Sequence, residues 1–567
     1  METDAALVPA EIDADLAELR DGAARWAALA PLSRARLLVD AYAATGRVAR
    51  EWAEGAAEAK GLHPDSAPAA QEWLTGPYAM LDALDAYASS LIALATRGTT
   101  LVGARFGHAP GGRVALRVLP ESLPQRLLLN GMRAEIWMPP GVTADQVRAE
   151  AGLGARRRGV SGGVGLVLGA GNITSIGPLD LLNALVSANR AGLLKLNPTL
   201  QSLLPVYRAA LAPLVEFGVA RVVVGDGALG SRIAAHEGID TVHITGSSAT
   251  HDRIVWGDGA EAQRRRVADE PLLRKPITSE LGGVSPVIVV PGRWSRADLQ
   301  YQAEHVATMR LHNAGHNCIA AQVLVVSRDW AQRDEFLAAV RAVFDRLPAR
   351  PPWYPGSAAR MAAVQATHPG AGEHAGRLVV EVGADSDDEL LRTESFSPVL
   401  VVTELPGTGV DFLGAAIAFS NDRLSGSLGA NVIVRPADRR AMGATFDEAV
   451  VDLRYGTIAI NAWTGVGFML SRGTWGAYPG GTLAAVGSGI GVVHNAHLIA
   501  RPERMIVTGA FAEFPRSLRH GECSLMPKPP WFVTSRSALA TARRLTDYAA
   551  SPSWARLLAS LVVAFRA

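Results

Sequence analysis

The most reactive side chain in this sequence lies in the stretch Leu311 to Ala320, LHNAGHNCIA. Cys318 is one of two cysteines in 567 residues, and it follows a Gly-His-Asn tripeptide. A cysteine between a helical run and a strand can be a nucleophile if nearby dipoles or cations stabilise its thiolate. A buried, inert cysteine is the structural alternative.

Two other residues have side chains that suit cysteine chemistry. Asn172 follows a glycine-rich loop, and a neutral amide can donate to a developing oxyanion without adding charge. Glu280 stands before Leu281, Gly282 and Gly283, and a partly desolvated carboxylate can have a raised pKa and serve as a base. The alternatives are a turn asparagine and a surface glutamate.

Two series of strands and helices must position these residues. In the first, short apolar strands alternate with helices, which predicts a parallel sheet with helices on both faces. Its predicted strands are 164–168, 193–196, 221–224 and 241–244. Glycines follow the first, third and fourth strands without spelling GxGxxG. Three such loops at the carboxyl ends of one sheet predict a nucleotide site.

The second series predicts another α/β domain, which contains Cys318. Its predicted strands are 287–290, 323–326, 378–382, 399–402 and 431–434. An amphipathic helix over 298–313 is expected to lead to Cys318, and residues 351–377 are expected to form a surface excursion. The first hundred residues have apolar side chains at helical spacing.

In their order along the chain, these motifs resemble the aldehyde dehydrogenase superfamily over roughly residues 160–495. The specific part is Glu-Leu-Gly-Gly-x-Ser-Pro at 280–286, followed by Gly-x-x-Cys ending at Cys318. Glu-x-Phe-x-Pro at 394–398 and Asn461 after a strand also match. The resemblance implies an α/β aldehyde dehydrogenase-like fold, with a Rossmann-like cofactor domain and a second α/β catalytic domain.

The expected division of the chain follows from this resemblance and from the pattern at its two ends. Residues 1–100 would be a helical region packed on the cofactor domain, and 101–285 the NAD(P)-binding domain. Residues 286–495 would be the catalytic domain, and 496–567 a C-terminal extension available for contacts in a homo-oligomer.

The resemblance also implies roles for single residues. Cys318 would be the nucleophile, the Asn172 amide and the Cys318 backbone N–H the oxyanion hole, and Glu280 the group that activates water. The residues expected to bind the cofactor are Lys195, Gly225, Gly246, Ser247, Glu394 and Phe396. No metal site is expected.

Three departures from the family pattern affect these expectations. Pro198 stands where many members have a glutamate that binds the adenine ribose, so both NAD and NADP stay open. Gly171 replaces an aromatic residue, and His316 replaces a glutamine. We expect His316 to be a structural donor, and help in ionising Cys318 is the alternative.

Three functions remain after these comparisons of motif and residue type. The first is NAD(P)-dependent oxidation of a small-molecule aldehyde to a carboxylic acid, through a thiohemiacetal and a thioester on Cys318. The second is a CoA-dependent acylating dehydrogenase or acyl-CoA reductase, which would not need Glu280 as a base. The third is a catalytically silent scaffold protein. Trp463, Phe468 and Met469 are candidates for an apolar funnel, or for core.

Composition limits the partners and the location. A formal net charge of +1 gives no reason to expect a nucleic acid. Two cysteines favour a reducing cytoplasm. No run approaches the ~18 apolar residues of an integral membrane span. The apolar run 557–565 is expected to form a terminal helix, docked on the body or on a partner, with an interfacial helix as the alternative.

Overall fold

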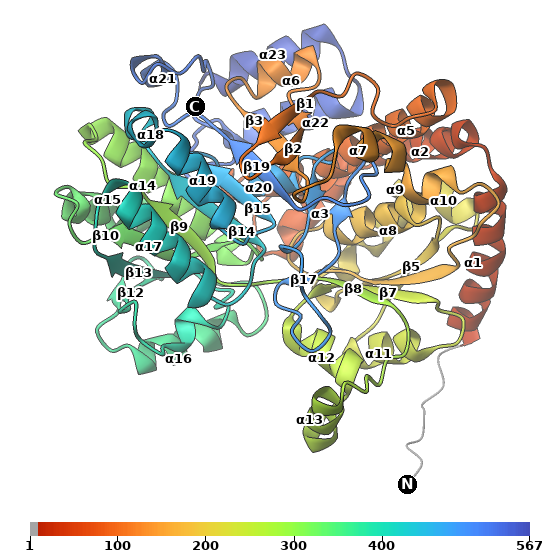
Figure 1. Cartoon of the computed structure of the whole chain (residues 1–567). Helices are drawn as coiled ribbons and strands as arrows, with labels where there is room; N and C mark the ends of the chain where they lie inside the picture. Colours follow the sequence, from red (N-terminus) through yellow and green to blue (C-terminus); the bar gives the residue numbers. More distant parts are fainter. Residues whose placement is uncertain (1–9, 567) are drawn as a thin grey trace.

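Six strands form the smaller of two large sheets (Figure 1). The computed structural model describes residues 10–566, so the first nine residues of the expected helical region lie outside the described residues. The order is β17-β8-β7-β4-β5-β6, and every pair is parallel except β17 with β8. The bounds are β4 Val164–Leu168, β5 Ala191–Leu196, β6 Ala220–Val224, β7 Thr241–Gly246, β8 Ile277–Leu281 and β17 Gly489–Ile490.

Helices cover both faces of this sheet, and its central strand β4 is accordingly apolar and buried along its whole length. In Figure 1, α8 lies above the sheet and α11 and α12 lie below it. The helices of this part are α8 Ile176–Ser187, α9 Leu204–Ala210, α10 Ala212–Glu216, α11 Gly227–Ala235, α12 Ser248–Trp256 and α13 Gly259–Ala268. Between β5 and β6 the helical stretch is divided, because the 3-10 turn Pro198–Leu203 precedes α9 and α10 follows it.

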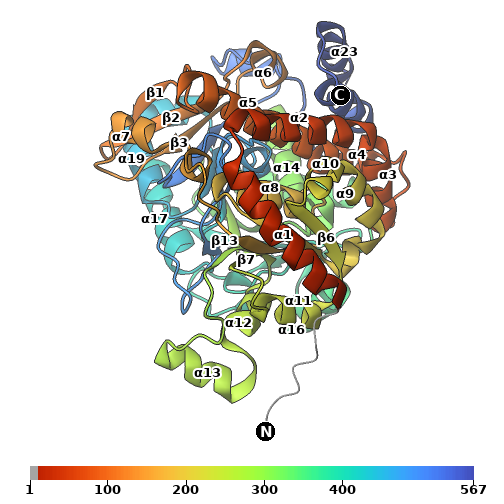
Figure 2. The same cartoon turned by 90° about the vertical axis from the view of Figure 1, so that its right-hand side faces the viewer.

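The N-terminal helices share one hydrophobic core with the smaller sheet. Figure 2 shows α1 lying across the sheet, and Trp26 on this helix donates from Nε1 to the carbonyl of Leu185, 3.1 Å away. The bounds are α1 Ala10–Ala28, α2 Pro31–Arg47, α3 Ala49–Ala59, α4 Ala70–Trp73 and α5 Ala79–Arg97. The helical stretch Ala67–Arg97 is long and apolar enough to cross a membrane by composition, but 56% of its apolar window is buried inside the protein. Burial of this kind is typical of a core helix.

The larger sheet has eleven strands, in the order β1-β2-β3-β19-β15-β14-β9-β10-β13-β12-β11. Its centre, from β19 to β12, is parallel, and hairpin-like antiparallel strands lie at both edges. The bounds are β1 Phe106–Ala109, β2 Arg113–Leu119, β3 Arg133–Trp137, β9 Ser285–Val289, β10 Ala321–Ser327, β11 Gly372–Glu373, β12 Leu378–Glu381, β13 Val399–Leu405, β14 Gly429–Ile433, β15 Thr457–Ile460 and β19 Arg504–Thr508.

Separate hydrophobic clusters fill the two faces of this larger sheet. The helices associated with it are α14 Arg296–Leu311, α15 Arg333–Arg346, α16 Ser357–Thr367, α17 Gly409–Asp422, α18 Pro436–Met442, α19 Ala444–Asp452 and α20 Thr464–Phe468. Elsewhere lie α6 Leu123–Leu128, α7 Ala144–Glu150, α21 Arg516–Arg519, α22 Ala538–Ala550, α23 Trp554–Ala564 and a small ribbon of β16 Thr474–Trp475 with β18 Val493–His494. The two sheets therefore correspond to the expected pair of α/β units.

The expected boundary at residue 101 does not coincide with the division between the sheets. Strands β1 to β3 extend the larger sheet, because β3 pairs with β19 near the other end of the chain. Strand β2 pairs with β1 and β3, so all three strands belong to the larger sheet, and the local sequence pattern does not determine this pairing. Strand β8 belongs to the smaller sheet and β9 to the larger, so the chain passes from one sheet to the other between residues 281 and 285.

Two segments near Cys318 differ in the structure from what the sequence predicts. Helix α14 is buried on nearly all sides rather than amphipathic, because α15 and the C-terminal segment cover the face that the sheet does not. The expected surface excursion 351–377 contains helix α16, and two of its residues reach the interior, as described below.

Candidate active site

Cys318 lies in a strained loop between α14 and β10. The loop begins with the 3-10 turn His312–Gly315, in which Asn313 and Ala314 have φ values of 54° and 55°. Alanine rarely adopts this left-handed conformation, so contacts from the surroundings must hold the turn in place.

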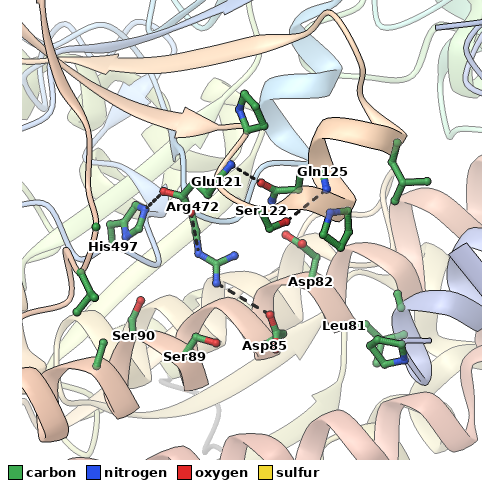
Figure 3. Close-up of a pocket in the computed structure, with 18 of the residues that line it drawn as sticks. Leu81, Asp82, Asp85, Ser89, Ser90, Glu121, Ser122, Gln125, Arg472 and His497 are labelled. Carbon is green, nitrogen blue, oxygen red and sulfur yellow. Dashed lines mark hydrogen bonds and ion pairs between the residues drawn. The ribbon is translucent and has the colours of Figure 1, made fainter. Parts of the chain in front are cut away.

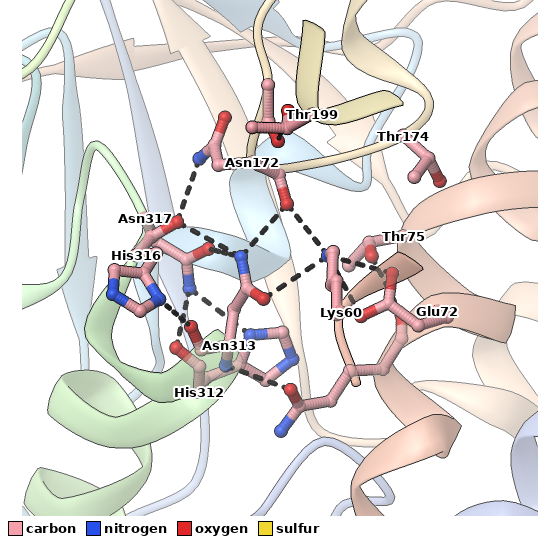
Figure 4. A network of polar contacts seen from close by, with 12 residues as sticks. Lys60, Glu72, Thr75, Asn172, Thr174, Thr199, His312, Asn313, His316 and Asn317 are labelled. Carbon is pink, nitrogen blue, oxygen red and sulfur yellow. Dashed lines mark hydrogen bonds and ion pairs between the residues drawn. The ribbon is translucent and has the colours of Figure 1, made fainter. Parts of the chain in front are cut away.

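Asn313 makes the contacts that hold this turn (Figure 4). Its backbone N–H donates to Gln71 Oε1 at 2.9 Å. Its amide Nδ2 donates to the carbonyl oxygens of Asn172 and His316, both at 3.0 Å. The cysteine loop is therefore fastened to the loop that follows β4.

A buried ion pair from the N-terminal helices supports the same two loops. Lys60 Nζ lies 2.8 Å from Glu72 Oε2, and both side chains are fully buried. The ammonium also donates to the Asn172 carbonyl at 2.8 Å and to Asn313 Oδ1 at 3.2 Å (Figure 4). Burial lowers the pKa of Lys60, and Glu72 opposes this shift. The segment from Lys60 to Glu72 thus helps to position the loops that carry Asn172 and Cys318, which its sequence pattern does not reveal.

His316 has both ring nitrogens in structural contacts. Nδ1 lies 3.0 Å from the Asn313 carbonyl, and Nε2 lies 2.9 Å from Ser357 Oγ. Burial lowers the pKa of His316 to about 3, so the ring is neutral. Because this neutral ring is engaged at both nitrogens, it accords with a structural donor and is not free to accept the proton of Cys318.

Asn172 lies between the end of β4 and the start of α8, and its amide faces the cysteine loop. Nδ2 donates to the His316 carbonyl at 2.9 Å. An amide nitrogen carries two hydrogens, so one donor remains. The side chain is 6% exposed, and it lines the cavities on both sides of Cys318.

Glu280, on strand β8, carries a buried carboxylate. It is 2% exposed, and neither carboxylate oxygen reaches hydrogen-bond geometry with a described residue, although Cys318 and Trp475 lie beside it. Burial, with a smaller contribution from Asp180, raises the pKa of Glu280 to about 7. A group of this pKa can accept and return a proton near neutral pH.

The thiol of Cys318 is held in its neutral form. Burial raises its pKa well above the ordinary value, and the neighbouring Glu280 charge raises it further. The side chain is nevertheless only half-buried, because it faces two cavities. Ionising this thiol requires either a proton acceptor beside it or a positive charge brought into the site.

One cavity, of about 510 Å³, lies at the carboxyl ends of the strands of the smaller sheet. Its walls include residues after β4, β5 and β7, as the sequence predicts for a parallel sheet. Five of the six expected cofactor residues line it: Lys195, Gly246, Ser247, Glu394 and Phe396. Gly225 does not line it, and it lies instead against Leu229. An added Cβ there would lie 2.3 Å from Leu229.

The residues of this cavity fit a dinucleotide. Ser247 caps helix α12, whose first N–H groups are suited to a phosphate. The Lys195 ammonium forms no hydrogen bond or ion pair among the described residues, although the side chain is only 6% exposed. A Cβ added at Gly227 would meet no atom within 4 Å, so the floor of the cavity is open there.

Glu394 joins the two sequence motifs of the site. A Cβ at Gly282 would lie 1.9 Å from Glu394 Oε2, so only glycine allows this carboxylate to rest against strand β8. Burial raises the pKa of Glu394 to about 8. Arg360 holds the same loop by donating to the carbonyls of Ser395 at 2.8 Å and Phe396 at 3.1 Å. Arg360 and Tyr354 come from the segment expected to be a surface excursion, and both line the cavity.

The second cavity, of about 300 Å³, lies on the other side of Cys318 and is mostly apolar. The expected funnel residues Trp463, Phe468 and Met469 line it. Its remaining walls come from the N-terminal helices, the region of α6 and the C-terminal segment. Asn172 and Cys318 border both cavities, so the reactive groups lie where the two meet.

A third, polar cavity of about 640 Å³ adjoins the apolar one (Figure 3). Tyr78, Asp82, Gln125 and Leu128 line both. Within the polar cavity, Glu121 accepts from Arg472 at 3.2 Å and contacts His497 Nε2 at 2.6 Å. These charges satisfy one another, and no group of the reactive centre lies there.

Comparison with known proteins decides the family. Residues 196–469 match the model of the aldehyde dehydrogenase family, and the matched part includes Glu280, Cys318 and Glu394. Solved aldehyde dehydrogenases superpose over most of the chain. The chain is a distant member of the aldehyde dehydrogenase family.

Its relatives within the aldehyde dehydrogenase family match only locally in sequence. A stretch of 129 residues is 33% identical to N-succinylglutamate 5-semialdehyde dehydrogenase of Sphingopyxis alaskensis and covers 23% of each chain. A stretch of 133 residues is 30% identical to betaine aldehyde dehydrogenase of Vibrio vulnificus and covers 24% of each. The matched stretches thus span about a quarter of the length of these relatives.

Similarity to solved aldehyde dehydrogenases extends much further and establishes the fold. γ-Glutamyl-γ-aminobutyraldehyde dehydrogenase from Burkholderia cenocepacia superposes with a TM-score of 0.58 at 21% identity, over 88% of both chains. A mutant of aldehyde dehydrogenase C from Pseudomonas syringae, in complex with NAD+ and octanal, gives 0.57 at 20% identity over 89% of both. The α/β aldehyde dehydrogenase-like fold expected from the motifs is therefore confirmed.

Proposed function

We propose that this protein oxidises an aldehyde to a carboxylic acid, with NAD or NADP as hydride acceptor and Cys318 as nucleophile. The observation that carries the proposal is that the Cys318 thiol, the Glu280 carboxylate and the Asn172 amide lie where the cavity lined by Lys195 meets the apolar cavity. The Glu280 carboxylate has no hydrogen-bond partner among the described residues. The matched solved structures that carry NAD+ or NADP support a dinucleotide in the cavity of about 510 Å³ that Lys195 and Ser247 line.

The residues of the chain act in a defined order in this proposal. Cys318 loses its proton to solvent and adds to the aldehyde carbonyl, and the positive charge of a bound nicotinamide would favour the thiolate. The oxyanion that forms accepts from the Asn172 amide and from the Cys318 backbone N–H. When bound, the nicotinamide ring accepts the hydride. Glu280 then takes a proton from water, which attacks the thioester and releases the acid.

The cofactor preference follows from the departure at Pro198. An acidic residue at that place would repel the 2′-phosphate of NADP, and the free Lys195 ammonium nearby attracts a phosphate. We therefore propose that NADP is accepted as well as NAD.

The test is turnover of hexanal with each cofactor, with and without CoA. We expect one reduced nicotinamide and one hexanoate per hexanal without CoA, and no turnover by Cys318→Ala. Reduction that requires CoA and gives hexanoyl-CoA would instead establish the acylating function. The absence of turnover under both conditions would contradict both functions.

A further inference from the structure

The apolar cavity is closed at its far end by the C-terminal segment. Residues of the extended stretch before α22 and of helices α22 and α23 line it, among them Trp531, Leu545, Leu561 and Ala564. The family match ends at residue 469, so this wall is contributed by a part of the chain that the family model does not cover.

Polar contacts fix this segment to the body of the protein. Lys528 Nζ and Thr534 Oγ1 both donate to Glu304 Oε2, on the buried helix α14, at 2.7 Å. Arg543 Nη2 donates to Asp65 at 2.7 Å. Helix α22 also packs against α2 and α4. The stretch from Lys528 to Arg543 is therefore fastened to the body of the protein, and α23 follows it and packs on α22.

Two charged side chains, Lys528 and Asp82, border the apolar cavity, and the first of them is paired. Lys528 is paired with Glu304, as just described. Burial lowers the pKa of His312 to about 3, which leaves that ring neutral. Burial raises the pKa of Asp82. Among the described residues, no other Lys, Arg, Asp or Glu lines this cavity. A negatively charged substituent on the substrate would be desolvated here without a free cationic partner, at a large cost.

Aromatic rings shape the end of the cavity beside Cys318. Phe468 packs edge to face on Trp475, with ring centroids 5.4 Å apart, and Trp463 contacts His312 at 4.7 Å. All three aromatic side chains line the cavity. The passage is thus apolar from the thiol to the terminal helix.

From these contacts we infer that the substrate is an aliphatic aldehyde of medium to long chain. Its chain lies in the apolar cavity and ends against α23, so the C-terminal segment sets the accepted length. The inference rests on the proposed function for the aldehyde group itself. A cavity of about 300 Å³ lies within the range of small-molecule sites, and its lining is predominantly apolar.

The test compares butanal, octanal and dodecanal, with one variant and a matched control on the same helix. In the wild-type protein, kcat/KM is expected to rise about fourfold for each methylene until the cavity is full. Ala564→Trp, which fills the far end, should lower kcat/KM for dodecanal by about tenfold or more and change butanal by less than about twofold. Val562→Trp, at a 57% exposed position outside the lining, should leave the profile unchanged.

A second variant and a binding measurement keep the inference independent of turnover. Leu561→Ala should shift the preferred aldehyde to a longer chain. Quenching of tryptophan fluorescence should show that dodecanoate binds more tightly than butanoate without cofactor, and that Ala564→Trp removes the difference. If this binding occurs and no aldehyde is oxidised, the proposed function fails and the chain-binding site stands. Equal affinity for both acids, or a flat chain-length profile in an active enzyme, would overturn the inference.

Discussion

The two cavities that meet at Cys318 are built in opposite ways. The cofactor-side cavity is made of short loops at the ends of parallel strands, with a lysine, a serine cap and two carboxylates in it. The apolar cavity is made of segments from both ends of the chain and from α20, and its one lysine, Lys528, is paired with Glu304. The first can hold charged groups and move protons, whereas the second selects only by size and apolar contact.

This difference explains which parts of the site the sequence could predict. Glu280, Cys318 and the cofactor residues lie in local motifs, because each needs a particular backbone shape over a few residues. Gly282 is an example, since the Glu394 carboxylate excludes any side chain there. The strands were predictable for a similar reason, as each is a short apolar run that helices cover.

Contacts between distant segments could not be predicted in this way. The Lys60–Glu72 pair joins the N-terminal helices to loops that follow much later in the chain, and only the fold brings them together. Arg360 lies in a stretch whose Pro, Gly and His content resembles a surface loop, yet it holds the Glu394 loop. The apolar wall from the C-terminal segment likewise has no motif, since packing against α14 and α4 determines it.

The largest effect is expected when the thiol of Cys318, which borders both cavities, is removed. Cys318→Ala should lower aldehyde oxidation by about 10⁴-fold or more, because the covalent bond cannot form. Cofactor binding and dodecanoate binding should both persist, as neither cavity loses its walls. Cys523→Ala, at an exposed cysteine, is the control and should keep full activity. Loss of activity in the control alone would refute the assignment.

A smaller effect is expected at Asn172, which also borders both cavities but forms no bond to the substrate carbon. Asn172→Ala should lower kcat by about 10²–10³-fold, the usual loss of one oxyanion donor. Asn421→Ala, whose amide donates to the Asp452 carbonyl outside both cavities, should have no effect. An unchanged kcat with chemistry shown to be rate-limiting would contradict the role of Asn172.

A change confined to the cofactor-side cavity should leave the apolar cavity intact. Lys195→Met should weaken cofactor affinity by about tenfold, because a charge-assisted contact is lost. Isothermal titration with NAD and NADP measures this, and dodecanoate affinity should stay the same. Lys275→Met is the control, since Lys275 does not line the cavity. Equal losses of cofactor and alkyl affinity would mean that the two cavities are not separate.

The smallest expected effect concerns pH. The pKa of Glu280 is raised to about 7, and only its ionised form can act as a base, so the base form increases as pH rises through that value. Hydrolysis of the thioester should therefore increase about threefold between pH 6.5 and 7.5. Single-turnover measurement of acid release checks this. A rate that falls over this range would show that the protonated carboxyl is the active form.

The central claim is that the carboxylate of Glu280 activates water after hydride transfer, and Glu280→Gln tests it most directly. An amide cannot take a proton from water, so the thioester on Cys318 should persist. Mixed with octanal and cofactor, the variant should give about one reduced nicotinamide per active site and then almost none, and an added thiol should restore turnover. Full steady-state activity would contradict the claim, and so would the absence of any burst, which would place the need for Glu280 before hydride transfer.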